Sequence, residues 1–363
     1  MAFIYGQTNN VSGETRITVS ASNSLRLLIS WRKKLEQTKY FIIVIVAIGV
    51  LIRLISIPLF AAHYNPVDVY YVDNQAAKLI LNFQNPYSQN LLAHGYALNT
   101  FAYLPMVPIF YAPFYILGDI RLGNIFADIV ILFSLYFIAK SINRGAAFFA
   151  PLAYAILPFS VWLTSVASTN IMIGASFLTV STAALVRRKH LEAAILLGLA
   201  LATSQLVFLA LPLIIFYFLG ERKISYFMGS LLVTAGIILP FFFQNTFQFI
   251  YDVILLQFQR PLQSNGVFSL YSLINATTGL SLTAWIRISL FLSVTLIAVI
   301  GLRRKKLLLV PLIGTLLFLG AFILPVNGFW NYFLPGAIFL IAGLPYVIDE
   351  ITIKIENSTS TYH

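Results

Sequence analysis

A succession of uninterrupted apolar runs constrains this chain more than any other feature. In lipid every backbone amide needs an internal partner, so only helices or closed barrels span a membrane, and unbroken runs exclude the alternation of barrel strands. With 59% hydrophobic and 10% charged residues, we predict an all-α, polytopic transmembrane helical bundle. The runs long enough to cross a hydrocarbon core of about 30 Å lie near 41–60, 121–139, 145–164, 170–186, 224–243, 284–301, 307–325 and 331–348.

Two further apolar stretches are irregular. The stretch 191–219 is too long for one span and carries a Thr-Ser-Gln triplet at 203–205, which predicts two short helices that meet at the outer face. The stretch 101–118 contains three prolines, each of which removes a backbone donor. Such a broken backbone is tolerated at membrane depth only when it is buried in protein or lines a cavity. We therefore interpret 101–118 as a re-entrant element that does not cross.

The basic residues support this interpretation. If 101–118 does not cross, 18 of the 23 Lys and Arg fall on the cytoplasmic side, as the positive-inside rule requires. If it crosses, the rule fails at four successive clusters. The non-crossing topology predicts about ten crossings with both termini in the cytoplasm. It leaves these cations outside or within the membrane: Arg53, Lys78, Arg121, Arg260 and Arg287.

The same topology predicts the organisation of the chain. We expect a cytoplasmic N-terminal tail at 1–40, one transmembrane domain at 41–348 and a cytoplasmic C-terminal tail at 349–363. Within the domain, the segment 61–121 and the loop 244–282 face outward, and the segment 61–121 would carry the chemistry.

Composition excludes several functions. The net charge of +11 comes from short clusters between apolar runs, which indicates membrane orientation and not a nucleic-acid partner. The chain has no cysteine, and none of its four histidines stand at helical ligand spacing. We therefore predict no metal site and no cofactor, with dependence on a divalent metal left open. Of the twelve acidic residues, the topology leaves five away from the cytoplasm: Asp68, Asp73, Asp119, Asp128 and Asp252.

Asp68 and Asp73 are the acidic residues of the first outer segment. Asp68 follows a proline turn, where an aspartate commonly caps a helix, so a structural role competes with a catalytic one. The amphipathic stretch 76–83 behind it predicts an interfacial helix in the headgroup plane. The two aspartates are five positions apart, about 140° around a helix, and therefore do not form an acid–base pair. No Asp-x-Asp metal motif or glycine-rich phosphate loop is present.

Several short motifs resemble those of integral-membrane glycosyltransferases of the GT-C superfamily. The nearest group is the polyprenol-phosphate-mannose-dependent mannosyltransferases, and the resemblance covers residues 41–220. At two positions the chain departs from the pattern: Phe83 stands near a usual glycine, and Gln205 stands where many relatives carry lysine. The motifs are Asp68-Val69-Tyr70-Tyr71, Ala76-Ala77-Lys78, Asn85-Pro86-Tyr87, Tyr103-Leu104-Pro105 and Asp119-Ile120-Arg121.

This resemblance implies an inverting transfer of mannose or another hexose from a polyprenyl (dolichyl) phosphate to a lipid or glycan acceptor on the extracytoplasmic face. It implies a catalytic base at Asp68, with Asp73 as the rival. The expected donor-phosphate or lipid contacts are Arg121, Lys78, Arg260, Arg53 and Gln205, and the expected substrate contacts are Tyr70, Tyr71, Tyr87, Tyr103 and His63.

Simpler structural roles remain open for these residues. Arg121 could be an interfacial anchor paired with Asp119, and Lys78 could reach lipid headgroups from an interfacial helix. Arg53 lies inside an apolar run and needs a partner, either the lipid phosphate or Asp128. From other functional classes, a membrane transporter, a lipid-linked sugar flippase or scramblase, and a scaffold subunit are the alternatives.

Overall fold

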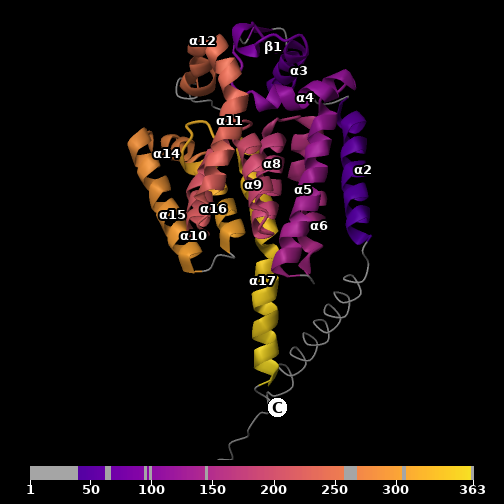
Figure 1. The fold of residues 1–363 in the computed structure, drawn as a ribbon, viewed down its shortest axis with the longest axis vertical. Helices are drawn as coiled ribbons and strands as arrows, with labels where there is room; N and C mark the ends of the chain where they lie inside the picture. The colour runs from indigo at the N-terminus through magenta and orange to yellow at the C-terminus, as the bar shows by residue number, and fades with distance from the viewer. Residues whose placement is uncertain are drawn as a thin grey trace, which may run out of the picture.

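The computed structural model describes residues 40–61, 67–93, 96–97, 100–143, 146–256, 268–304 and 308–360. This part of the chain is a helical bundle whose upper end carries a cap of short elements (Figure 1). The all-helical fold class predicted from the apolar runs is confirmed. His63, Arg260 and the tail before residue 40 lie outside the described residues.

Five described helices are long and apolar enough to cross a membrane, or six when one bent pair is counted as a span. The predicted ten crossings therefore require several of the shorter apolar helices to cross as well, and that count stays a prediction. The long helices are α2 (Phe41–Ala61), α5 (Arg121–Ile142), α11 (Ile224–Gln244), α15 (Ala284–Arg304) and α17 (Leu334–Ser360).

The bent pair replaces the single span expected at 145–164. Helix α6 (Phe149–Ala155) is followed by α7 (Pro158–Val161) and the π-helical turn η3 (Trp162–Val166), with a bend of 55° between the two halves. Pro158 causes the break, because a proline disfavours the helical conformation of the residue before it. Leu157 is accordingly extended, with φ −66° and ψ 111°.

The stretch 191–219 folds as two short helical segments, as its central polar triplet predicts. Helix α9 (His190–Leu201) ends before a break, after which η4 (Gln205–Ala210) leads into α10 (Leu211–Gly220). The hydroxyl of Ser204 accepts a hydrogen bond from the Leu206 amide at the start of η4. The remaining short apolar helices are α8 (Ile171–Val186) and α16 (Leu309–Ile323).

The cap is built largely from the first predicted outer segment. It contains α3 (Asp68–Leu81), which packs against α4 (Met106–Ile116). An 11-residue helix rises about 16 Å, roughly half of a hydrocarbon core. This length is compatible with the non-crossing interpretation of 101–118, which stays a prediction. The other cap elements are η1 (Pro86–Ser88), the hairpin of β1 (Leu92–Ala93) with β2 (Tyr96–Ala97), α12 (Thr246–Ile250) and η5 (Tyr251–Leu255).

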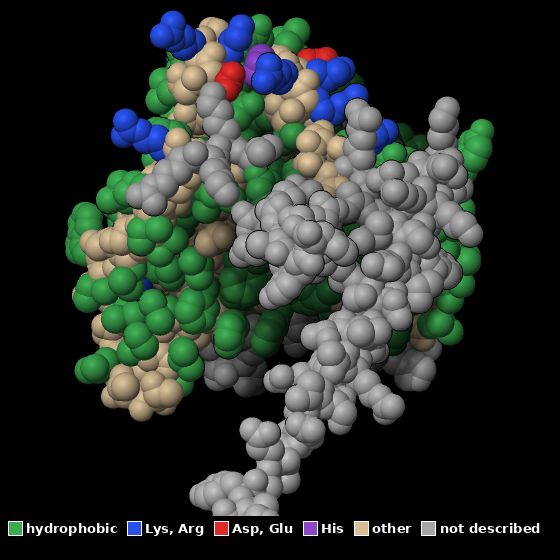
Figure 2. Space-filling model, turned by 90° about the horizontal axis from the view of Figure 1, so that it is seen from below, with side chains coloured by type: hydrophobic (Ala, Val, Ile, Leu, Met, Phe, Trp, Pro, Cys, Tyr) green, Lys and Arg blue, Asp and Glu red, His purple; other side chains and the backbone are tan. Residues whose placement is uncertain are grey.

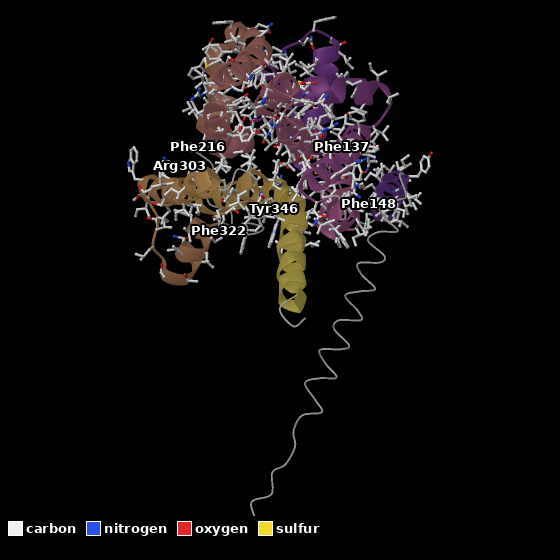
Figure 3. All side chains as sticks on the ribbon, turned by 60° about the horizontal axis from the view of Figure 1, so that its bottom comes forward. Phe137, Phe148, Phe216, Arg303, Phe322 and Tyr346 are labelled. Carbon is white, nitrogen blue, oxygen red and sulfur yellow. The ribbon has the colours of Figure 1, made fainter. Side chains whose placement is uncertain are left out.

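Basic clusters gather at the end opposite the cap. The Arg187 guanidinium at the end of α8 lies 4.8 Å from the ring centre of Phe137, near the end of α5. The Tyr217 hydroxyl of α10 donates to the Leu185 carbonyl, which brings a third helix end to the same level. Lys and Arg side chains line one edge of this lower end, and Phe137 and Arg303 both lie there (Figures 2 and 3). Basic side chains therefore cluster at this end, and the side of the membrane that it faces stays a prediction.

Glycines allow two helix pairs to approach closely. A Cβ at Gly198 of α9 would lie 2.6 Å from the Ser230 carbonyl oxygen of α11, and a Cβ at Gly314 of α16 would lie 2.8 Å from the Leu340 amide of α17. Small residues serve this purpose in membrane bundles, where close backbone packing stabilises helix pairs. The interior beneath the cap is therefore tightly packed.

Candidate functional site at the cap

Asp68 is the first residue of α3 and is exposed at the surface of the cap. The N-cap residue is Val67, whose amide donates to the Ala167 carbonyl, so Asp68 does not occupy the N-cap position. The Asp68 carboxylate accepts the Val69 amide at 2.9 Å, one of the free donors of the first turn. A carboxylate at a helix N-terminus is also favoured by the helix dipole. Asp68 is therefore an exposed carboxylate held at the start of α3.

Arg121 begins α5 and meets α3 at Tyr70. Its guanidinium binds Asp119, with 2.6 Å between Nη2 and Oδ2, and lies 5.5 Å from the centre of the Tyr70 ring. Asp119 also accepts the Arg121 amide at 2.9 Å. Burial, followed by the nearby Asp119 carboxylate, raises the pKa of Tyr70. The anchoring pair considered for Arg121 therefore exists, but the Arg121 side chain stays 18% exposed, and Nη1 has no partner in the described part of the chain.

Asp73 has a different environment from Asp68 on the same helix. It is fully buried, and the Asn170 amide nitrogen donates to its Oδ1 at 3.4 Å. Its Oδ2 has no hydrogen-bond partner among the described residues. Burial raises the pKa of Asp73 well above the ordinary carboxyl range, which favours the neutral acid. Asp73 is thus a weaker candidate for a base than Asp68.

A buried polar chain continues below Asp73 and was not among the predicted site residues. The Tyr111 hydroxyl of α4 donates to Asn124 of α5 at 2.6 Å, and the Asn124 amide donates to the Ser168 hydroxyl at 3.2 Å. Ser168 adopts a positive φ of 53°, an uncommon conformation for a residue other than glycine. The sequence contains one signal for this buried hydrogen-bond network, because Asn124 is a polar residue inside an apolar run.

Arg53 of α2 is buried in the bundle and has only protein partners. Its Nε binds Asp128, and its Nη2 donates to the Ser160 hydroxyl at 2.8 Å. Its Nη1 donates to the carbonyls of Gly49 at 3.1 Å and Ala155 at 3.0 Å, and the second of these carbonyls lies at the break after α6. Of the two partners considered for Arg53, the structure supplies Asp128. The guanidinium has no free edge for a lipid phosphate, so we leave Arg53 out of the proposed site.

Gln205 at the start of η4 and Tyr87 of η1 both bind carbonyl groups of the segment before α4. The Gln205 amide donates to the carbonyls of Ala102 and Val253 at 3.2 and 3.4 Å. The buried Tyr87 donates its hydroxyl to the Tyr103 carbonyl at 2.6 Å. These contacts hold the chain before α4 in position, so the structure gives Gln205 and Tyr87 a structural role within the cap.

The remaining predicted contacts lie on α3. Tyr71 packs edge-on against Tyr70, with ring centres 5.4 Å apart, and Lys78 is exposed in the last turn. Among the described residues, no group of three or more His, Cys, Asp or Glu could hold a metal ion. The structure therefore brings together Tyr70, Tyr71 and Arg121, with Asp68 at the start of the same helix.

No family model matches this sequence, and no curated protein matches it either. Among the solved structures that share its fold are two states of one protein. The crystal structure of ArnT from Cupriavidus metallidurans bound to undecaprenyl phosphate superimposes with a TM-score of 0.59 at 16% identity, over 85% of this chain and 60% of that chain. The apo state of the same protein gives a TM-score of 0.56 at 14% identity, over 84% and 59%.

At these identities the superpositions show the fold alone, and this fold agrees with the polytopic helical architecture that the sequence predicts. The chain spans about 60% of the length of the ArnT structures that it matches.

Proposed function

We propose that this protein is an inverting glycosyltransferase that moves a sugar from a polyprenyl phosphate to an acceptor hydroxyl at the outer face of the cell membrane. The observation that carries the proposal is the position of Arg121 against Tyr70, on the helix that begins with Asp68. The fold shared with a protein that was crystallised with undecaprenyl phosphate supports a polyprenyl-phosphate donor. Mannose or another hexose, and a lipid or glycan acceptor, complete the proposal.

Asp68 is the proposed base. A lipid phosphate is a good leaving group, so the reaction needs no general acid, and one carboxylate suffices to take the proton of the attacking hydroxyl. The acceptor oxygen forms a bond to the anomeric carbon as the bond from that carbon to the phosphate oxygen breaks. The polyprenyl phosphate leaves with the bonding electrons. The exposure of Asp68 supports this role, because the acceptor hydroxyl must reach the carboxylate.

Arg121 is the proposed phosphate contact. Negative charge develops on the leaving phosphate, and a guanidinium beside it lowers the barrier, more strongly where water is limited. The unpaired Nη1 can bind a phosphate oxygen while the opposite side of the guanidinium keeps its bond to Asp119. Lys78, which is exposed on α3, supplies a second cation. Tyr70 and Tyr71 offer aromatic rings for contact with the sugar.

Transfer by the purified protein in vesicles tests the proposal. Vesicles would contain a polyprenyl phosphate carrying a radiolabelled hexose, together with a lipid extract that supplies acceptors. We expect the label to leave the donor and free polyprenyl phosphate to accumulate. A flippase or transporter would instead move the intact donor between leaflets without releasing polyprenyl phosphate, and that result would contradict the proposal.

A further inference from the structure

Arg287 of α15 is buried and has no counter-ion among the residues that the structure describes. The residue is 9% exposed, its Nη1 donates to the Leu324 carbonyl, and its guanidinium carbon lies 5.4 Å from the centre of the Tyr271 ring. Its Nε is buried and has no hydrogen-bond partner among the described residues. The sequence offers no nearby carboxylate either, because no Asp or Glu occurs between Asp252 and Asp349.

Two arginines of other helices are neutralised by carboxylates. Arg53 binds Asp128, and Arg121 binds Asp119. Arginine keeps its proton in proteins, so Arg287 cannot avoid its charge by titrating. Since most of its side chain is covered by protein, Arg287 does not reach water as a snorkelling residue would. A buried, permanent charge without an anion is strongly unfavourable, which indicates that an anion binds there.

The surroundings of Arg287 are those of a membrane–water boundary. Its neighbours on α15, Trp285 and Ile286, are 78% and 47% exposed on the surface of an apolar helix. The amphipathic α14 (Leu270–Thr278) lies beside the upper part of α15 (Figure 1). Close by in the sequence, Phe268 stacks on Trp330 with ring centres 5.5 Å apart and planes 10° apart. Exposed apolar and aromatic residues of this kind contact lipid.

We propose that Arg287 binds the phosphate group of a lipid, at an outer site distinct from that of Arg121. A phosphate oxygen would accept a hydrogen bond from Nη2, and a small shift of the side chain would let a second oxygen accept from the buried Nε, which gives the bidentate arrangement that guanidinium groups favour. Nη1 would keep its bond to the Leu324 carbonyl, and Tyr271 would cover one face of the guanidinium. The two sites lie on opposite sides of the bundle, because α14 and α15 are on the far side from α2 and α5 (Figure 1).

Lipid binding can be measured by native mass spectrometry on the full chain. We would place all variants in an Arg121→Gln background, so that the proposed donor site does not contribute. The ligands are a polyprenyl phosphate, phosphatidylglycerol, diacylglycerol without phosphate, and inorganic phosphate. The matched control is Arg303→Gln, which removes the same charge from an exposed residue at the opposite end of α15 (Figure 3).

We expect Arg287→Gln to weaken binding of at least one phosphate lipid tenfold or more, with no change for diacylglycerol. The lipid for which the affinity of the variant falls is the one that supplies the phosphate. Unchanged affinity for both phosphate lipids, or an effect confined to inorganic phosphate, would overturn the proposal. If Arg287→Gln does not fold, Arg287→Lys serves in its place, because it keeps the charge but not the bidentate edge. That variant should lose at least threefold in affinity, and wild-type affinity would contradict the proposal equally.

Discussion

The guanidinium of Arg121 lies 5.5 Å from the centre of the Tyr70 ring, which joins the start of α5 to the interfacial helix α3. This contact places a partly exposed cation beside the helix that begins with Asp68. Since Asp119 occupies only part of the guanidinium, the contact positions Arg121 without saturating it. The proposed division of labour, with a base on α3 and a phosphate contact on α5, depends on this junction.

Loss of the Arg121 charge should slow transfer. We expect Arg121→Gln to lower kcat/KM by about 10²–10³-fold, the usual effect of removing one preorganised stabilising group. Arg121→Lys should recover part of the loss, since it restores the charge but not the planar fork. Lys140→Gln is the matched control, because it removes one exposed charge from the other end of α5. Equal activities for Arg121→Gln and this control would show that Arg121 is only an anchor.

The burial of Asp73 should make stability depend on pH. Its pKa is raised in the folded state by burial, so the folded chain binds a proton that the unfolded chain has already released above the ordinary carboxyl range. The stabilisation is complete below the unfolded pKa and is lost as the pH rises toward the folded pKa, by up to about 1.4 kcal/mol per pH unit. Asp73→Asn should lack this dependence when apparent Tm is followed in detergent across pH. Parallel pH profiles for the two proteins would contradict the assignment.

Much of the fold follows from sequence patterns. The polar triplet at 203–205 marks a break that the structure contains, whereas the broken backbone expected at 101–118 is wrong, because α4 runs through Pro113 as one short helix. The bend at Pro158 was not predicted, because the surrounding run has the length of one span and a proline alone does not distinguish a kink from a break.

The site is harder to predict than the fold, because it depends on which helix faces meet. Two aspartates five positions apart on α3 look equivalent in the sequence, yet packing against the turn before α8 buries Asp73 and leaves Asp68 exposed. The sequence limits Arg53 to two partners, a lipid phosphate or Asp128. Only the packing of α2 against α5 selects Asp128.

Removal of one charge of the Arg53–Asp128 ion pair should destabilise the protein more than removal of both charges. Asp128→Asn leaves a buried arginine without its counter-ion, which costs about 3–5 kcal/mol in comparable buried pairs. The double variant Arg53→Met with Asp128→Leu removes both charges and should melt at a temperature closer to that of the wild type. If the double variant is less stable than Asp128→Asn alone, the pair contributes net stability and the expectation is wrong.

Close packing between α9 and α11 should make Gly198 sensitive to substitution. A Cβ there would meet the Ser230 carbonyl oxygen at 2.6 Å, and overpacking of this kind costs about 1–3 kcal/mol. Gly236→Ala on α11 is the matched control, since nothing lies within 4 Å of a Cβ at that position. We expect apparent Tm to fall for Gly198→Ala and to stay level or rise for Gly236→Ala. Equal Tm values would show that the helices can separate without loss.

The most direct test of the central claim is the transfer rate of purified Asp68→Asn beside that of Asp73→Asn, with a radiolabelled polyprenyl-phosphate hexose as the donor. Asn keeps the size of Asp but cannot accept the proton of the attacking hydroxyl. We predict a loss of about 10²–10⁴-fold for Asp68→Asn, the usual contribution of a general base. Asp73→Asn should retain most activity, because the buried Asp73 is held neutral. Full activity in Asp68→Asn, or a loss confined to Asp73→Asn, would contradict the account.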